Sequence, residues 1–208
     1  MARKFERKPA SREIRNKILI ACEGSKTEPA YFEGIRKSLR LSTVQIKILP
    51  HLGTDPLRIV EAAIAGRQDM KVDKAWITGD RAWAVFDGDE HIANNPDNWR
   101  SALAKAKSQK IDLAITNPCF EFWYLIHFRD HLAQIDRIKT LALLKQHVSD
   151  YEKAACLYPE PLSLLTTQAI QRARKIAEQI QRDQLAPFSN PCCSELPELV
   201  ESLLKLAT

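Results

Sequence analysis

The sequence has no hydrophobic run long enough to cross a membrane and no cysteine pattern typical of a disulfide framework. None of its 208 residues lies in a segment approaching the ~18 consecutive apolar residues that a membrane span needs. The five cysteines are odd in number, and the adjacent Cys192 and Cys193 lack the second pair that a zinc site requires. The basic N-terminus is followed by neither an apolar segment nor a cleavage site, which excludes a secretory signal. These absences predict a cytoplasmic protein without membrane contact.

The composition is that of an ordinary globular protein with a mild excess of positive charge. Apolar residues make up 45% of the chain and charged residues 27%, and the formal net charge is +5. Basic residues concentrate in the N-terminal arm, residues 1–16, which either contacts phosphates or is a solvated tail. The length is sufficient for one domain with an appendage.

Strand and helix patterns alternate from residue 17 to about residue 130. Three segments rich in apolar residues have the length of strands, 17–22, 82–86 and 111–115, and 44–48 alternates apolar and polar residues as expected for a strand with one wetter face. Helical stripes follow them within 27–39, 57–64, 99–106 and 120–128, and Thr27 is expected to cap the first helix. The alternation predicts an α/β fold with right-handed crossovers and a mainly parallel four-stranded sheet flanked by helices.

Beyond residue 130 the pattern is helical only. Helices are expected over 135–148, 162–185 and 196–204, separated by proline-rich breakers. The predicted organisation is therefore an α/β domain over residues 17–130 and a helical C-terminal region over 131–208 that packs on the core.

Acidic residues follow two of the predicted strands directly. Glu23 follows the first strand, and Asp87 and Asp89 follow the third. In a strand order of 2-1-3-4 these strands are neighbours, so the three carboxylates meet at the carboxyl edge of the sheet. Clustered carboxylates repel one another, and a hard cation such as Mg²⁺ removes that repulsion. Each acid also has a simpler explanation, as a helix cap or as part of an Asp-Gly-Asp turn.

Three competing motifs fail on particular residues. A phosphate-binding loop of the Walker type needs glycines where Ile20 and Ser25 stand. His127 and His131 have the spacing of a zinc helix, but Phe128 replaces the required Glu. A haloacid-dehalogenase-like phosphohydrolase places Asp-x-Asp-x-Thr after its first strand, whereas here the motif follows the third strand and ends in His91.

Four sequence blocks together resemble the RloB-like proteins. They are ILIACEGSKTEPAYF (18–32), GTDPL (53–57), AVFDGDE (84–90) and NPCFEFWYLIHF (117–128). The similarity extends over about residues 15–185, and that family resembles the Toprim fold, with a Glu after strand one and Asp-x-Asp after strand three. Gly88 departs from the charged residue that the family more often has between the aspartates, and residues 190–197 also depart from the family pattern.

The resemblance implies a metal site and a role for each of its acids. Glu23, Asp87 and Asp89 would be metal ligands, with Glu23 also a candidate general base or acid. Glu121 would be a fourth ligand, unless it only complements the dipole of the helix that it begins.

Two lysines are implied as contacts to the scissile phosphate. Lys26 lies three residues after Glu23, and Lys153 belongs to a Tyr-x-Lys motif that recurs in the family. All six residues, Glu23, Asp87, Asp89, Glu121, Lys26 and Lys153, are therefore candidate catalytic residues.

The resemblance implies a Mg²⁺-dependent endonuclease of the Toprim type, in which Mn²⁺ can substitute. Its substrate would be RNA such as tRNA, or DNA, in prokaryotic anti-phage defence by abortive infection, with an ATPase as partner. Two alternatives remain open. One is a catalytically silent subunit that binds nucleic acid or a nucleotide and regulates a defence complex, and the other is a phosphatase or primase-type activity on the same acids. The oligomeric state is also left open.

Overall fold

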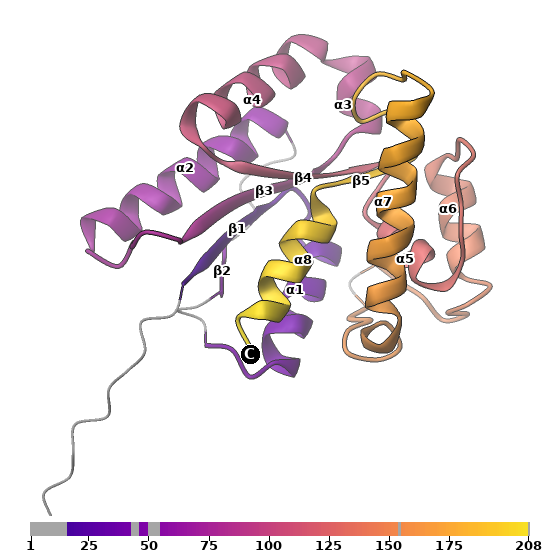
Figure 1. The fold of residues 1–208 in the computed structure, drawn as a ribbon, viewed down its shortest axis with the longest axis horizontal. Coiled ribbons are helices and arrows are strands. Elements are labelled where there is room, and N and C mark those ends of the chain that lie inside the picture. The colour runs from indigo at the N-terminus through magenta and orange to yellow at the C-terminus, as the bar shows by residue number, and fades with distance from the viewer. Residues whose placement is uncertain (1–15, 43–45, 50–54, 154, 208) are drawn as a thin grey trace, which may run out of the picture.

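The fold is built on a five-stranded sheet in the order β2-β1-β3-β4-β5 (Figure 1). The computed structural model describes residues 16–42, 46–49, 55–153 and 155–207, and only the backbone of Asp89 and Glu90. The strands are β1 (Ile18–Cys22), β2 (Ile46–Ile48), β3 (Arg81–Asp87), β4 (Asp112–Asn117) and β5 (Cys192–Ser194). The first four are parallel, and β5 pairs antiparallel with β4. The predicted order 2-1-3-4 and the parallel pairing are confirmed.

The predicted number of four strands was wrong because β5 carries no strand pattern of its own. It has three residues, it follows a proline-rich breaker, and two of its residues are the adjacent cysteines. Its register is set by pairing with β4, where Cys193 lies opposite Thr116. Such a short segment is a strand because of its partner rather than its propensity. The C-terminal region is therefore not purely helical, since it supplies one strand of the sheet.

Eight α-helices are present in the described part of the chain. They are α1 (Thr27–Ser38), α2 (Pro56–Val72), α3 (Asp89–Asn94), α4 (Pro96–Gln109), α5 (Glu121–Phe128), α6 (Arg137–Leu144), α7 (Thr166–Arg182) and α8 (Leu196–Lys205). A single 3₁₀ turn, residues 163–165, precedes α7. None of these helices combines the length and the apolar character that crossing a bilayer needs.

Several helix boundaries differ from the sequence-based expectation. Thr27 is the first residue of α1 rather than its cap, and Lys26 at the N-cap makes no side-chain capping bond. The helix α3 was not predicted, because Asp87 to Glu90 were interpreted as a loop. The helix expected over 135–148 ends at Leu144. Residues 1–15, 43–45 and 50–54 lie outside the described residues, so the predictions for the N-terminal arm and for Gly53 and Thr54 are not addressed.

The two faces of the sheet belong to two apolar clusters. Leu19 and Ala21 of β1 face α2 and α4, whereas Ile18, Ile20 and Cys22 face the cluster that includes α1, α5, α7 and α8 (Figure 1). All five side chains of β1 are buried, as expected for a parallel strand covered on both sides. A strand covered in this way leaves only its ends accessible to a ligand.

The second of these clusters encloses a neutral histidine, His127 of α5. The side chain is fully buried, and its Nδ1 donates to the carbonyl oxygen of Trp123 at 2.8 Å. Its Nε2 has no hydrogen-bond partner among the described residues, and the guanidinium of Arg172 is bonded to the carbonyl oxygens of Ile126 and His127. Burial, together with this cation, lowers the pKa of His127 to about 4.

His127 makes the stability of the protein depend on pH. Its pKa is about 4 when folded and about 6.5 when unfolded, so the unfolded state binds the proton more tightly. The contribution of the neutral ring to the free energy of unfolding is complete above pH ~6.5. This free energy falls by on the order of 3 kcal/mol in total as the pH drops towards 4. Urea unfolding at a series of pH values should show that the free energy of unfolding falls less steeply between pH ~6.5 and ~4 for His127→Gln than for the unchanged protein. An identical slope in both proteins would contradict this assignment.

Candidate functional site

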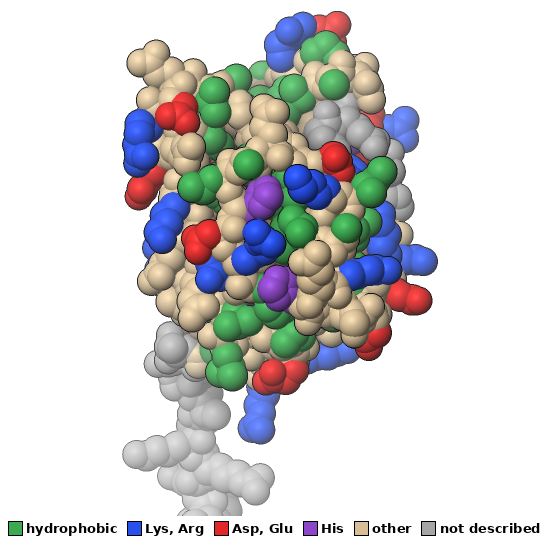
Figure 2. All heavy atoms as spheres, turned by 90° about the vertical axis from the view of Figure 1, so that its right-hand side faces the viewer, with side chains coloured by type: hydrophobic (Ala, Val, Ile, Leu, Met, Phe, Trp, Pro, Cys, Tyr) green, Lys and Arg blue, Asp and Glu red, His purple; other side chains and the backbone are tan. Residues whose placement is uncertain are grey.

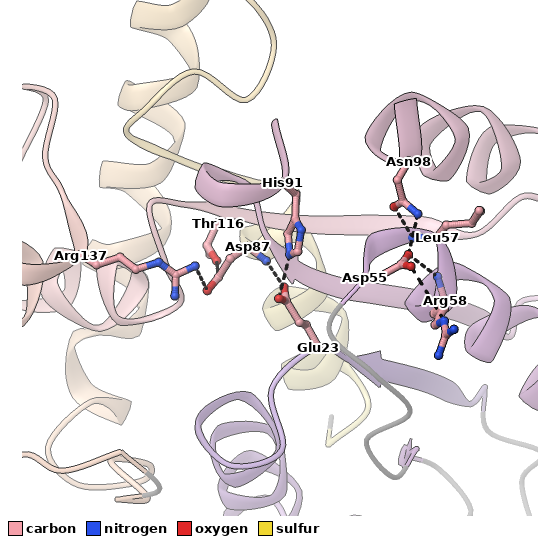
Figure 3. A network of polar contacts seen from close by, with 9 residues as sticks. All are labelled: Glu23, Asp55, Leu57, Arg58, Asp87, His91, Asn98, Thr116 and Arg137. Carbon is pink, nitrogen blue, oxygen red and sulfur yellow. Dashed lines mark hydrogen bonds and ion pairs between the residues drawn. The ribbon is translucent and has the colours of Figure 1, made fainter. Parts of the chain in front are cut away.

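The parallel pairing of β1 with β3 brings Glu23 and Asp87 into contact. Cys22 lies opposite Val85, and the N–H of Glu23 continues the ladder by donating to the Val85 carbonyl at 2.9 Å. The N–H of Asp87 donates to Oε2 of Glu23, also at 2.9 Å. Figure 3 shows the carboxylate of Glu23 against the backbone of Asp87, whose own carboxylate points toward Thr116 and Arg137. The predicted convergence of these two acids is therefore observed.

Asp87 is a buried carboxylate with two further partners. Its Oδ1 accepts from the hydroxyl of Thr116 on β4 at 2.6 Å, and its Oδ2 lies 3.3 Å from Nη2 of Arg137, at the start of α6 (Figure 3). Burial, with Glu28 and Glu23 nearby, raises the pKa of Asp87 well above its usual value, although the Thr116 bond and Arg137 act in the opposite direction. This carboxylate would gain from a nearby cation.

A third carboxylate, Glu28 in the first turn of α1, was missed in the sequence. It is 5% exposed, and its Oε2 packs against the backbone of Gly24. Burial, with Glu23 and Glu121 nearby, raises its pKa to about 7. Gly24 is needed for this arrangement, because a Cβ there would lie 2.0 Å from Oε2 of Glu28.

Glu121, the first residue of α5, is the fourth acid at this edge. Its side chain is buried, and its Oε1 accepts from the hydroxyl of Tyr151 at 3.2 Å. A carboxylate at this position also complements the dipole of α5. Glu121 lines the same pocket as Glu23 and Asp87, so its side chain lies near the acids with which it was predicted to group.

These residues line one pocket of about 300 Å³, which we call the acidic pocket. It is enclosed by the β1–α1 connection, by the ends of β3 and α5, and by side chains from the C-terminal region. Four carboxylates and three cations line it: Glu23, Glu28, Asp87, Glu121, Lys26, Arg137 and Lys153. Five of the six predicted site residues therefore meet in one pocket. Both lysines are exposed to solvent, so their ammonium groups can meet a phosphate at the rim.

Asp89, the sixth predicted residue, begins α3, and its side chain is outside the described part of the structure. In the part of the chain that is described, no three His, Cys, Asp or Glu side chains are grouped closely enough to hold a metal ion. The donor set of the acidic pocket nevertheless consists of carboxylate oxygens, the ligands that Mg²⁺ prefers. The chemistry of the pocket therefore fits a hard divalent cation, although its carboxylates are not already arranged around one.

Asp55, from the sequence block 53–57, has a structural role. Its side chain accepts from the backbone N–H of Arg58 at 3.2 Å, which caps α2, and from the amide of Asn98 at 2.8 Å (Figure 3). Asn98 in turn accepts from the N–H of Leu57. These bonds join α2 to α4 and leave Asp55 outside the acidic pocket.

Besides Glu28, sequence reasoning missed His91, Thr116 and Arg137. The Nε2 atom of His91, on α3, lies 2.9 Å from Oε1 of Glu23. Glu28 and His91 had a local signal, because Glu28 lies five residues after Glu23 and His91 four residues after Asp87. Arg137 had none, because it is 50 residues from Asp87 in the sequence and only the packing of α6 places it there.

The packing of Glu28 on Gly24 gives a measurable prediction. Gly24→Ala should displace the flexible carboxylate of Glu28 into solvent, because the new Cβ occupies its place. The pKa of Glu28, measured by carbon NMR of labelled glutamate, should fall from about 7 towards ~4.3. Assignment of the resonance by Glu28→Gln is the control, and an unchanged pKa in Gly24→Ala would rule out this packing.

One of three comparisons with known proteins gives a match, and it is to a protein family. A profile of the RloB-like protein family matches residues 18–203 of the 208. No curated protein and no solved structure gives a match. The matched span contains all five strands, and it includes every residue that lines the acidic pocket. This chain therefore belongs to the RloB-like protein family.

Proposed function

We propose that this RloB-like protein is a metal-dependent nuclease of the Toprim type that hydrolyses phosphodiester bonds in RNA, such as tRNA, or in DNA, as part of prokaryotic anti-phage defence. The supporting observation is the acidic pocket, in which carboxylates from the ends of β1 and β3 meet three cationic side chains. The carboxylates provide ligands for a metal, and the cations can contact a polynucleotide phosphate once a bound metal has offset the negative charge of the carboxylates. The ATPase partner remains part of this proposal.

The proposed metal ligands are Glu23 and Asp87, joined by Asp89 and Glu121. When bound, Mg²⁺ or Mn²⁺ would supply an activated water and neutralise charge on the leaving oxygen. The chain contributes the geometry. The N–H of Asp87 and the ring of His91 hold the two oxygens of Glu23, while Thr116 holds one oxygen of Asp87. These contacts position the two carboxylates at the edge of the sheet, and metal binding would exchange some of them for bonds to the cation.

The proposed phosphate contacts are Lys26, Lys153 and Arg137. Lys26 precedes α1 and Lys153 follows Tyr151, so they reach the pocket from two different elements. During hydrolysis the water oxygen bonds to phosphorus while the bond to the leaving sugar oxygen breaks. The cations stabilise the extra negative charge on the phosphoryl oxygens.

A second candidate function is a binding subunit that uses the same pocket without catalysis. The observation in its favour is that Asp87 is already paired with Arg137, and that no three potential ligands converge within the described residues. The two functions differ in one outcome, because only the nuclease shortens a polynucleotide.

Metal binding should raise the melting temperature of the protein. At ten times the Kd for Mg²⁺ or Mn²⁺, a chain of this size should gain about 3–6 °C relative to the chelator-treated protein. Asp87→Asn should reduce that gain to near zero, because it removes a charged ligand. Asp97→Asn, on the exposed surface of α4, makes the same chemical change away from the pocket and should keep the full gain. An equal gain in both variants would place the metal elsewhere.

Cleavage should depend on the same residues. With Mg²⁺ or Mn²⁺ and a panel of tRNA, single-stranded RNA and DNA, Glu23→Gln and Asp87→Asn should each lower the rate by roughly a hundredfold or more, the scale of losing one electrostatic group of an active site. Lys26→Ala and Lys153→Ala should lower it by a smaller factor, because each removes one of three cations. Asp97→Asn should cleave at the unchanged rate.

The two functions and the site assignment can be separated by these results. Metal-dependent cleavage that survives Glu23→Gln and Asp87→Asn would rule out the acidic pocket as the active site. Metal binding that is lost in Asp87→Asn, without cleavage of any substrate in the panel, would favour the binding subunit. Release of inorganic phosphate without shorter polynucleotides would instead indicate a phosphatase.

A further inference from the structure

A second pocket of about 510 Å³ adjoins the acidic pocket, and Arg137 lines both. We call it the α6 pocket. It lies beyond the end of β4, between Pro118, the start of α6 and Asn190, which precedes β5. Because Arg137 lines both pockets, a ligand that occupies both would contact its side chain.

The wall of the α6 pocket is held by a pair of hydrogen bonds. The side chain of Asn190 accepts from the N–H of Ile135 at 3.0 Å and donates to its carbonyl at 2.6 Å. Asp136 turns its carboxylate to the N–H of Lys139 at 2.7 Å, where it caps α6. These contacts fix the backbone from which Arg137 and Lys139 project, so the pocket does not depend on a ligand for its shape.

The two pockets differ in charge. Carboxylates outnumber cations in the acidic pocket, whereas Arg137 and Lys139 outnumber the single carboxylate, Asp136, in the α6 pocket. Lys139 is exposed. Figure 2 looks onto the side of the molecule that carries α6, and Lys and Arg side chains lie near its centre beside two histidines. A phosphate is therefore attracted to the α6 pocket without a metal, which does not hold for the acidic pocket.

We propose that the α6 pocket is a subsite for the phosphodiester next to the scissile one, and that the substrate there is a single strand. This inference rests on the proposed nuclease function. The single strand follows from burial: Asp87 and Glu121 are 8% and 5% exposed, so the scissile phosphate must enter a pocket of about 300 Å³. A duplex is a stiff, stacked helix and resists the local deformation needed to push one of its phosphates into such a pocket, whereas a single strand adapts to it.

The test is strand binding in chelator, which needs neither metal nor cleavage. Fluorescence anisotropy with labelled oligo(dT) and oligo(U) of about 12 nucleotides would compare the unchanged protein with Lys139→Glu and Lys71→Glu. Both variants change the charge equally, but Lys71 is exposed on α2, on the opposite face of the sheet. Lys139→Glu should weaken binding about fivefold or more, and Lys71→Glu less than twofold. Lys139→Ala should also reduce the salt dependence by the equivalent of about one phosphate contact.

The outcomes separate the subsite from the nuclease proposal. Equal weakening by Lys139→Glu and Lys71→Glu would overturn the subsite, because only net charge would then matter. Duplex binding at least as tight as single-strand binding would overturn the single-stranded substrate. If Lys139→Glu weakens binding but no substrate is cleaved with metal, the subsite stands and the nuclease fails. If substrate is cleaved with metal but Lys139→Glu binds the strand as tightly as the unchanged protein, the nuclease stands and the subsite fails.

Discussion

The parallel pairing of β1 with β3 is the constraint on which the site depends. It places the carboxylates of Glu23 and Asp87 at the same edge of the sheet, where Asp87 has little access to water. Removing carboxylates from water and placing them together are both unfavourable. The surrounding structure reduces that cost through a backbone N–H, the Thr116 hydroxyl and the Arg137 guanidinium. A bound cation would reduce it further, and this is the physical basis for proposing a metal.

The C-terminal region takes part in the site as well as in the core. It contributes Arg137 and Lys153 to the acidic pocket, and Tyr151 to the buried bond with Glu121. It also completes the sheet with β5, next to the strand that carries Thr116. A truncation at the end of the α/β segment would therefore remove two cations and expose the edge of β4. The predicted boundary near residue 130 divides the sequence pattern, but the site extends across it.

The sequence predicted those features of the fold and the site that depend on local residue patterns. Apolar runs and the alternation at 44–48 identified the parallel strands, and the position of Glu23 and Asp87 after two of them identified two pocket residues before any packing was known. It did not predict β5, whose three residues form a strand only against β4. Arg137 was missed for the same reason, since an arginine at the start of a helix has no signal for a partner 50 residues away.

The charge of the acidic pocket implies that cation and phosphate binding depend on each other. With its four carboxylates ionised, the pocket carries more negative than positive charge, and a phosphate entering it alone is repelled. Burial raises the pKa values of Asp87 and Glu28, and the repulsion from the neighbouring acids raises them further. A bound divalent cation would make the net charge of the pocket positive. The free energy by which the cation strengthens phosphate binding must equal the free energy by which the phosphate strengthens cation binding. The α6 pocket needs no such partner, so a strand can be held there before the acidic pocket is neutralised.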